Sequence, residues 1–159
     1  MSGVLPPFQR FLDSNREVVW RFLVASVGAV EAEDCFQETF IAALSAYPRL
    51  RPESNLRAWV MTIAHNKALD SHRARARRAV PVAEPAAVEV RGAPERAVRD
   101  DALWTAVGGL PERQRSAVVL RYLGDLPHRE IAAAIGCSEE AARRSLHEGL
   151  TKLRKAVPA

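Results

Sequence analysis

Apolar residues recur at three- and four-residue intervals along most of the chain, which is the spacing of an amphipathic α-helix. This pattern predicts helices over 8–27 (as one helix or two), 31–47, 56–78, 95–107, 111–123, 127–135 and 139–155. Glycines that end helices stand between several of them, as at Gly28, Gly108-Gly109 and Gly136. No stretch alternates apolar and polar residues as a half-buried strand does, so the predicted fold class is all-α.

The segment 79–94 lacks this periodicity. It holds three prolines and no sustained apolar repeat, which is typical of a flexible linker. A chain of 159 residues is long enough for one ordinary domain or two small ones. We therefore predict two small helical domains, 1–78 and 95–159, joined by the linker 79–94.

The last two predicted helices have the spacing of a helix-turn-helix. Gly136 ends the first helix, and Ser138 is the predicted N-cap of the second. Small side chains at Ala132 and Ala142 would let the two helices cross closely. Opposite its apolar stripe, the second helix carries the side chains expected to enter a DNA groove, namely Glu140, Arg143, Arg144 and His147. The pattern leaves open an ordinary helical hairpin with a solvated charged face.

Charge is distributed unevenly along the chain. Lys and Arg (23) exceed Asp and Glu (19), and the net charge of +4 suits a polyanionic partner. Basic residues concentrate in 72–78 and 143–155. The helix predicted over 56–78 is apolar at its start and basic at its end. Its first turns, which include Trp59, would therefore lie in a core, while its basic last turns would project toward phosphates. The alternative is a solvated helix end whose cations interact favourably with the helix dipole.

The helix predicted over 31–47 is acidic on one face. Its apolar stripe consists of Phe36, Phe40, Ala43, Leu44 and Tyr47, and its polar face of Asp34, Gln37, Glu38 and Ile41. Asp34 and Glu38 stand four residues apart, and like charges at this spacing weaken an isolated helix. A cation from outside this helix is therefore expected to compensate them.

Several kinds of chemistry have no support in the sequence. It contains no glycine-rich phosphate loop, zinc-protease motif or nucleophile elbow. Cys35 and Cys137 are far apart and outside any metal-ligand spacing, so they are predicted to be buried thiols in a reducing cytoplasm. We predict no enzymatic activity, no cofactor and no metal. The N-terminus does not resemble a signal peptide and no apolar run would span a bilayer, so no membrane association is expected.

Two stretches of the chain resemble the RNA polymerase sigma factors of the extracytoplasmic-function class. Residues 33–40, together with 55–70 and the arginines that follow, resemble region 2 of that family. Residues 110–155 resemble its region 4. The two stretches occur in the family's order, cover most of the chain and have no large domain between them.

The resemblance implies a promoter-specificity subunit that binds core RNA polymerase and promoter DNA and performs no chemistry itself. Asp34, Gln37 and Glu38 match the helix face that docks on the polymerase. The part that reads the minus-ten element is matched by Asn66, Lys67, Asp70 and Arg73, with Arg75, Arg77 and Arg78 as phosphate contacts. The positions that face the minus-thirty-five element are Glu140, Arg143, Arg144 and His147. An anti-sigma protein is a further partner that the family suggests.

The chain departs from the family's usual residues in both regions. Ser145 and Glu148 stand where basic residues are common, which implies fewer phosphate contacts. Glu148 could instead accept a hydrogen bond from a cytosine amino group, and both interpretations stay open. In region 2, Leu44 replaces a frequent Trp and Cys35-Phe36 replaces an aliphatic pair. These replacements are expected to alter core packing only.

Two other functions compete with the sigma hypothesis. A free-standing regulator would bind an operator through the helix-turn-helix and use the N-terminal helices to dimerise or to sense a signal. A protein that sequesters polymerase and no longer reads promoters would fit the acidic residues Glu139 and Glu140 at the DNA-facing end of the last helix.

Overall fold

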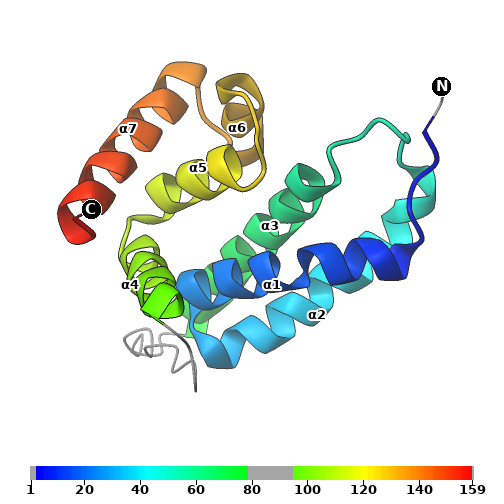
Figure 1. The fold of residues 1–159 in the computed structure, drawn as a ribbon, viewed down its shortest axis with the longest axis horizontal. Helices are drawn as coiled ribbons and strands as arrows, with labels where there is room; N and C mark the ends of the chain where they lie inside the picture. Colours follow the sequence, from blue (N-terminus) through cyan, green and yellow to red (C-terminus); the bar gives the residue numbers. More distant parts are fainter. Residues whose placement is uncertain (1–2, 79–94, 159) are drawn as a thin grey trace.

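A computed structural model describes residues 3–78 and 95–158 of the chain (Figure 1). The described helices are α1 (Phe8–Val27), α2 (Ala29–Ala46), the short 3-10 helix η1 (Tyr47–Arg49), α3 (Leu56–Arg78), α4 (Glu95–Gly108), α5 (Glu112–Tyr122), α6 (His128–Ile135) and α7 (Glu139–Ala156). These two ranges contain no strand. The all-α prediction is confirmed, whereas the linker predicted over 79–94 lies outside the described residues.

The boundary between the first two helices depends on a glycine. The segment predicted as one helix or two is a single helix, α1, and its last turn closes when the Gly28 N–H donates to the Val24 carbonyl. Gly28 has φ of +86°, a left-handed backbone conformation that side chains with a Cβ rarely adopt. The chain can therefore turn between α1 and α2 without a loop.

An aromatic cluster centred on Phe11 fills the space between α1, α2 and α3. The Phe11 ring is almost fully buried, and its centroid lies 5.2 Å from that of Tyr47 and 5.7 Å from that of Trp59. The hydroxyl of Tyr47 donates to the carbonyl of Pro6, which ties the chain before α1 to this cluster. Trp59 is half-buried among these rings, as its apolar neighbours predicted.

One residue of the predicted core lies outside it. Leu44 is 56% exposed, because it follows the fully buried Ala43 by about 100° around α2. That step turns it toward Ile41, which is 65% exposed. The predicted apolar stripe was too wide, and the expectation that Leu44 affects core packing was wrong.

The C-terminal half, residues 95–158, contains the predicted helix-turn-helix. The turn passes through Gly136 with φ of +71°, and the Ser138 hydroxyl caps α7 by accepting from the Ala141 N–H at 3.1 Å. Ala132 and Ala142 are both buried where α6 and α7 cross. These features were predicted from the sequence, and they fix the angle at which α7 leaves the turn.

The N-terminal half, residues 3–78, packs directly against the C-terminal half. Helix α1 contacts α4 and α5 as well as α2 and α3, and α3 also contacts α5 (Figure 1). Buried apolar residues form one continuous core across both halves, from Phe11 in α1 to Leu153 in α7. The helical pattern of the sequence did not predict this packing.

Replacing Phe11 with alanine should lower the free energy of unfolding by about 3–5 kcal/mol, because it leaves a cavity in the centre of the aromatic cluster. Urea denaturation followed by circular dichroism measures this. Leu44→Ala is the control, since it removes an exposed side chain and should change the free energy by less than about 0.5 kcal/mol. Similar losses for both variants would contradict the described placement of the two side chains.

Candidate nucleic-acid and protein interfaces

The acidic face of α2 consists of Asp34, Gln37 and Glu38, and all three side chains are exposed. Among the side chains of residues 3–78 and 101–158, no ion pair involves Asp34 or Glu38. The exposed side chains of Ile41 and Leu44 continue the same side of the helix by one and two turns. Acidic groups beside exposed aliphatic groups suit a protein partner that offers cations around an apolar patch. The sequence analysis placed Ile41 on this face but assigned Leu44 to the apolar stripe, so it left only Leu44 out of this surface.

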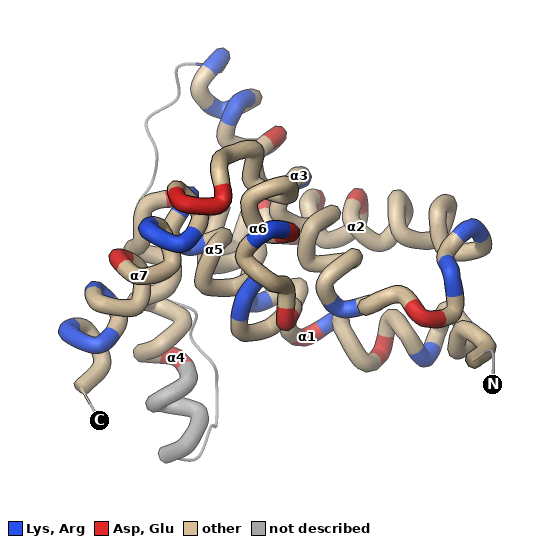
Figure 2. Tube along the Cα trace, turned by 90° about the horizontal axis from the view of Figure 1, so that it is seen from above, with Lys and Arg blue, Asp and Glu red and all other residues tan. Residues whose placement is uncertain are grey.

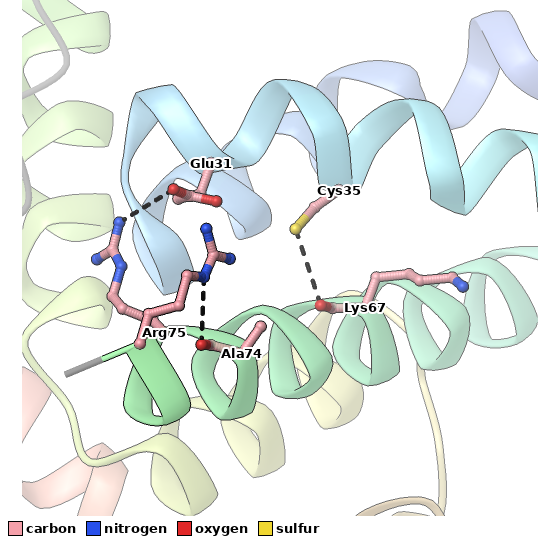
Figure 3. A network of polar contacts seen from close by, with 6 residues as sticks. Glu31, Cys35, Lys67, Ala74 and Arg75 are labelled. Atoms are coloured by element: carbon pink, nitrogen blue, oxygen red, sulfur yellow. Dashed lines mark hydrogen bonds and ion pairs between the residues drawn. The ribbon is translucent and has the colours of Figure 1, made fainter. Parts of the chain in front are cut away.

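A different acid on α2 is neutralised inside the molecule. Glu31 forms an ion pair with Arg75 on α3, with 3.5 Å between Glu31 Oε1 and Arg75 Nη2 (Figure 3). Both side chains are partly buried. Arg75 was predicted to contact phosphate, but in this structure its guanidinium is held against α2.

The remaining polar residues of α3 divide between two sides of the helix. Asn66, Asp70, Arg73 and Arg77 are exposed, and their spacing of four, three and four residues places them on one stripe. Lys67 is half-buried, and Figure 3 shows its side chain extending along α3 away from Arg75. Arg78 is exposed, and its Nε donates to the carbonyl of Ala74 within the same helix at 3.4 Å.

The stripe along α3 ends in a concentration of positive charge. Lys and Arg gather at the C-terminal end of this helix in Figure 2, beyond the part of it that packs on the core. Such a helix can present a polar stripe to bases and a cationic end to phosphates. The structure thus brings together on one exposed surface four of the seven residues predicted for the minus-ten site.

The thiol of Cys35 lies between α2 and α3. It donates to the carbonyl of Lys67, with 3.8 Å between sulfur and oxygen (Figure 3). Burial is the main cause that raises the pKa of this thiol above its ordinary value. A thiol held protonated in this way is unreactive. The prediction that Cys35 is a buried thiol is confirmed. Cys137 is also free but is only half-buried, so the prediction of a buried thiol was wrong for Cys137.

Four residues predicted to face DNA lie on the exposed side of α7. Glu140, Arg143, Arg144 and His147 are all exposed. Arg143 is already paired, because its Nη2 donates to Glu139 Oε1 at 2.8 Å. This hydrogen bond is the main cause that lowers the pKa of Glu139. Arg144 and His147 take part in no ion pair within the described part of the chain.

Ser145 and Glu148, the two residues of α7 that differ from the family's usual basic residues, have different surroundings. Ser145 is 8% exposed and faces the core of the helix-turn-helix, so it offers no contact to DNA. Glu148 is exposed, and its Oε2 accepts from Gln114 Nε2 of α5 at 3.0 Å. A basic residue at 145 would have to be buried, which is costly for a charge. We therefore interpret Ser145 as a residue that packs within the helix-turn-helix.

The helix-turn-helix offers one further cation that sequence reasoning missed. Arg129 on α6 is exposed, and its charge contributes to lowering the pKa of Glu139 at the start of α7. It therefore lies on the side of the motif where α7 begins. The signal available in the sequence was its position as the third residue of the helix predicted over 127–135.

The side chains of residues 3–78 and 101–158 include no group of three His, Cys, Asp or Glu placed to hold a metal ion. None of the helices described is both long enough and apolar enough to cross a bilayer.

Family models match both halves of the chain. The model for sigma-70 region 2 matches residues 11–78, and the model for sigma-70 region 4 matches residues 100–153. The first match contains the acidic face and the α3 stripe. The second contains the helix-turn-helix with all four of its predicted DNA-facing residues.

Proteins similar to this chain over most of their length are named RNA polymerase sigma factors. The ECF RNA polymerase sigma factor SigD of Mycobacterium tuberculosis is 33% identical over 171 aligned residues, which cover 100% of this chain and 81% of SigD. The RNA polymerase sigma factor CarQ of Myxococcus xanthus is 34% identical, with coverage of 97% of this chain and 91% of CarQ.

Solved structures share the fold. The sigma factor RpoE, in a co-crystal structure with the anti-sigma factor NepR from Bartonella quintana, superposes with a TM-score of 0.72 at 20% identity, covering 94% of this chain and 95% of that one. CnrH, solved in complex with the cytosolic domain of CnrY, gives 0.58 at 23% identity, covering 93% and 85%.

The pairing of Arg75 predicts unequal contributions from the arginines of α3 to DNA binding. Arg77→Gln should reduce the slope of log affinity against log salt by about 0.9 for duplex DNA, since it removes one free phosphate contact. Arg75→Gln should change the slope less, because Glu31 already neutralises this cation. Fluorescence anisotropy with a labelled duplex across a salt series measures both. Equal changes in slope would show that Arg75 is as free as Arg77.

Proposed function

This chain belongs to the extracytoplasmic-function class of RNA polymerase sigma factors, and from that membership we propose which surface performs each step of its function. It is a promoter-specificity subunit, which binds core RNA polymerase and directs transcription initiation at a particular set of promoters. The observation that carries this conclusion is the match of region 2 and region 4 to the two halves of one chain, in that order. A free-standing regulator is not favoured, because it would need no region 2.

Core polymerase binds the acidic face of α2. Asp34, Gln37 and Glu38 are exposed, and no cation of the described chain neutralises the two carboxylates. Ile41 and Leu44 add about two turns of exposed aliphatic surface to the same side. A polymerase surface with cations around an apolar patch would satisfy both, and burial of the aliphatic groups would contribute most of the affinity.

The exposed side of α3 binds the minus-ten element. Asn66, Asp70 and Arg73 supply donors and acceptors at one-turn spacing for bases, and Arg77 and Arg78 supply exposed cations for phosphates. Lys67 and Arg75 contribute less in this arrangement, because Lys67 is half-buried and Arg75 is paired with Glu31. Opening of the duplex would let the bases reach this stripe as single strands.

The start of α7 binds the minus-thirty-five element in a major groove. Arg144 and His147 are exposed and free, whereas Arg143 must exchange Glu139 for a base or a phosphate. Glu140 lies beside them in the first turn and can accept from a cytosine amino group. Glu148 is held toward α5 by Gln114, so we assign it no base contact.

The work divides between an N-terminal domain, 1–78, and a C-terminal domain, 95–159, with 79–94 as the linker. Neither domain needs to bind DNA tightly when the polymerase holds both on the same promoter, since the second contact is then intramolecular. The protein acts in the cytoplasm with the polymerase and catalyses no reaction itself. The similar structure of RpoE, solved with the anti-sigma factor NepR, suggests a partner of that kind for this chain as well.

Asp34→Arg should abolish association with core polymerase while leaving the fold intact, because it places a cation on an exposed acidic face that is proposed to meet cations. Co-purification of the full-length variant with core enzyme measures association, and circular dichroism checks the fold. Asp13→Arg on α1 is the matched control, since it makes the same charge change at an exposed position away from this face. Unchanged association of Asp34→Arg would refute the proposed docking surface.

Run-off transcription with core polymerase of the same organism and genomic promoter fragments tests the function itself. Discrete transcripts should require the protein. Arg144→Ala should weaken recognition of the minus-thirty-five element by about 1–3 kcal/mol, the value of one bidentate contact to a base. Specific operator binding without any transcript would support the free-standing regulator. Polymerase binding with neither transcripts nor promoter binding would support sequestration.

A further inference from the structure

An acidic side chain stands where the helix-turn-helix would meet DNA. Glu139 is the first residue of α7, one turn before Arg143, which is among the residues predicted to face the minus-thirty-five element. Arg143 Nη2 donates to Glu139 Oε1 at 2.8 Å, which is the length of a charge-assisted hydrogen bond. The phosphates of DNA repel a carboxylate and attract a guanidinium. This pair therefore joins a group that opposes DNA binding to a group that favours it.

Both members of the pair are open to solvent. The side chain of Arg143 is 61% exposed and that of Glu139 is 49% exposed, so a DNA strand can reach the guanidinium without unfolding a helix. Exposed ion pairs contribute little to the stability of a fold. The start of α7 is also capped already, because the Ser138 hydroxyl accepts from the Ala141 N–H. Helix stability alone therefore gives little reason for an acid at this position.

Cations from both helices of the motif surround this carboxylate. The hydrogen bond from Arg143 is the main cause that lowers the pKa of Glu139, and the charges of His128 and Arg129 at the start of α6 lower it further. In Figure 2 the acids that begin α7 are followed along the helix by Lys and Arg, and α6, which contacts α7, carries a further cation. Glu139 is therefore ionised at neutral pH and lies among groups that attract an anion.

A backbone phosphate of DNA offers Arg143 the same chemistry as this carboxylate. Both are anions whose oxygens accept short hydrogen bonds from a guanidinium. A phosphate that takes the Nη2 donor must displace Glu139, since two anions side by side repel each other. The neighbouring Arg144 takes part in no ion pair within the described part of the chain. Only one of the two adjacent arginines is thus occupied before DNA arrives.

We propose that Glu139 is an internal competitor of DNA, whose carboxylate occupies the place of a backbone phosphate at Arg143 and leaves it when α7 binds. The start of α7 then binds DNA more weakly than its cations would allow, and Glu139 sets that limit. This inference rests on the proposed function in one respect, namely that α7 meets DNA. It does not depend on the promoter sequence, because a phosphate contact carries no sequence information.

Fluorescence anisotropy of the full-length protein with a labelled DNA duplex of arbitrary sequence, across a salt series, tests the competitor. Glu139→Gln should bind about twofold to fivefold more tightly, which is the strength of an exposed ion pair. The slope of log affinity against log salt should become steeper by about 0.9, because one more arginine is free to contact a phosphate. If Glu139 only stabilised the first turn of α7, the same variant should bind DNA more weakly.

Glu130→Gln is the matched control. It removes the same charge from an exposed acid in the first turn of α6, and no ion pair involves Glu130 among the side chains that the structure describes. Its effect on affinity should be smaller than that of Glu139→Gln, and the salt slope should stay as in the wild type. Equal effects of the two variants would reduce the role of Glu139 to net charge and would overturn the proposal.

A double-mutant cycle identifies the arginine that Glu139 holds. Arg143→Gln should change the salt slope little in the wild-type protein, but should lower it by about 0.9 in the Glu139→Gln background. Arg144→Gln should lower the slope by about 0.9 in both backgrounds, because Arg144 is free in each. Circular dichroism checks that every variant keeps its helices.

Two results would overturn the competitor. One is an equal effect of Arg143→Gln in both backgrounds, and the other is a wild-type chain that binds no duplex even at low salt. Run-off transcription by the wild-type protein keeps the two hypotheses apart. Transcripts that depend on the protein, together with either of these results, would remove the competitor and leave the proposed function standing.

Discussion

Burial of α1 is the interaction on which the rest of the structure depends. Val19 and Leu23 on this helix are completely buried, and the helix contacts α2, α3, α4 and α5. The buried side-chain amide of Asn15 uses both of its polar groups in hydrogen bonds. Its NH2 group donates to the Phe11 carbonyl, and its oxygen accepts from Arg57 of α3. With its inner surface covered in this way, α2 can leave its acidic face free and α3 can leave its polar stripe free.

Local pattern was enough to predict the helices. The three- and four-residue spacing and the glycines at the turns located all seven, and the capping serine located the start of α7. The exposure of Leu44 was missed because a run of apolar letters does not show where the buried arc of a helix ends. Only the position of Phe40 and Ala43 against α1 and α3 defines that edge.

The sequence could predict which helix faces carry the binding residues, but not which of these side chains pair with residues of other helices. Exposure of Asp34, Asn66 and Arg144 follows from helical periodicity alone. The engagement of Arg75 by Glu31 joins residues 44 positions apart and depends on how α2 and α3 pack. The burial of His65 is of the same kind, since the sequence placed it at the start of a basic run while α5 covers it in the structure. Long-range packing, which local periodicity does not encode, decides these cases.

Because the two halves pack against each other, the affinity for polymerase can depend on residues that do not touch polymerase. If polymerase binds only molecules whose two halves have separated, the apparent dissociation constant is the intrinsic one divided by the fraction of such molecules. A tenfold change in that fraction corresponds to about 1.4 kcal/mol, which is within the effect of a single buried contact. Gly108 packs closely on the Ala25 backbone of α1, and Ser116 is hydrogen-bonded to His65 of α3. These contacts between the halves could therefore set how strongly this subunit competes for a limited pool of core enzyme. Such a change would leave the set of promoters that it recognises untouched.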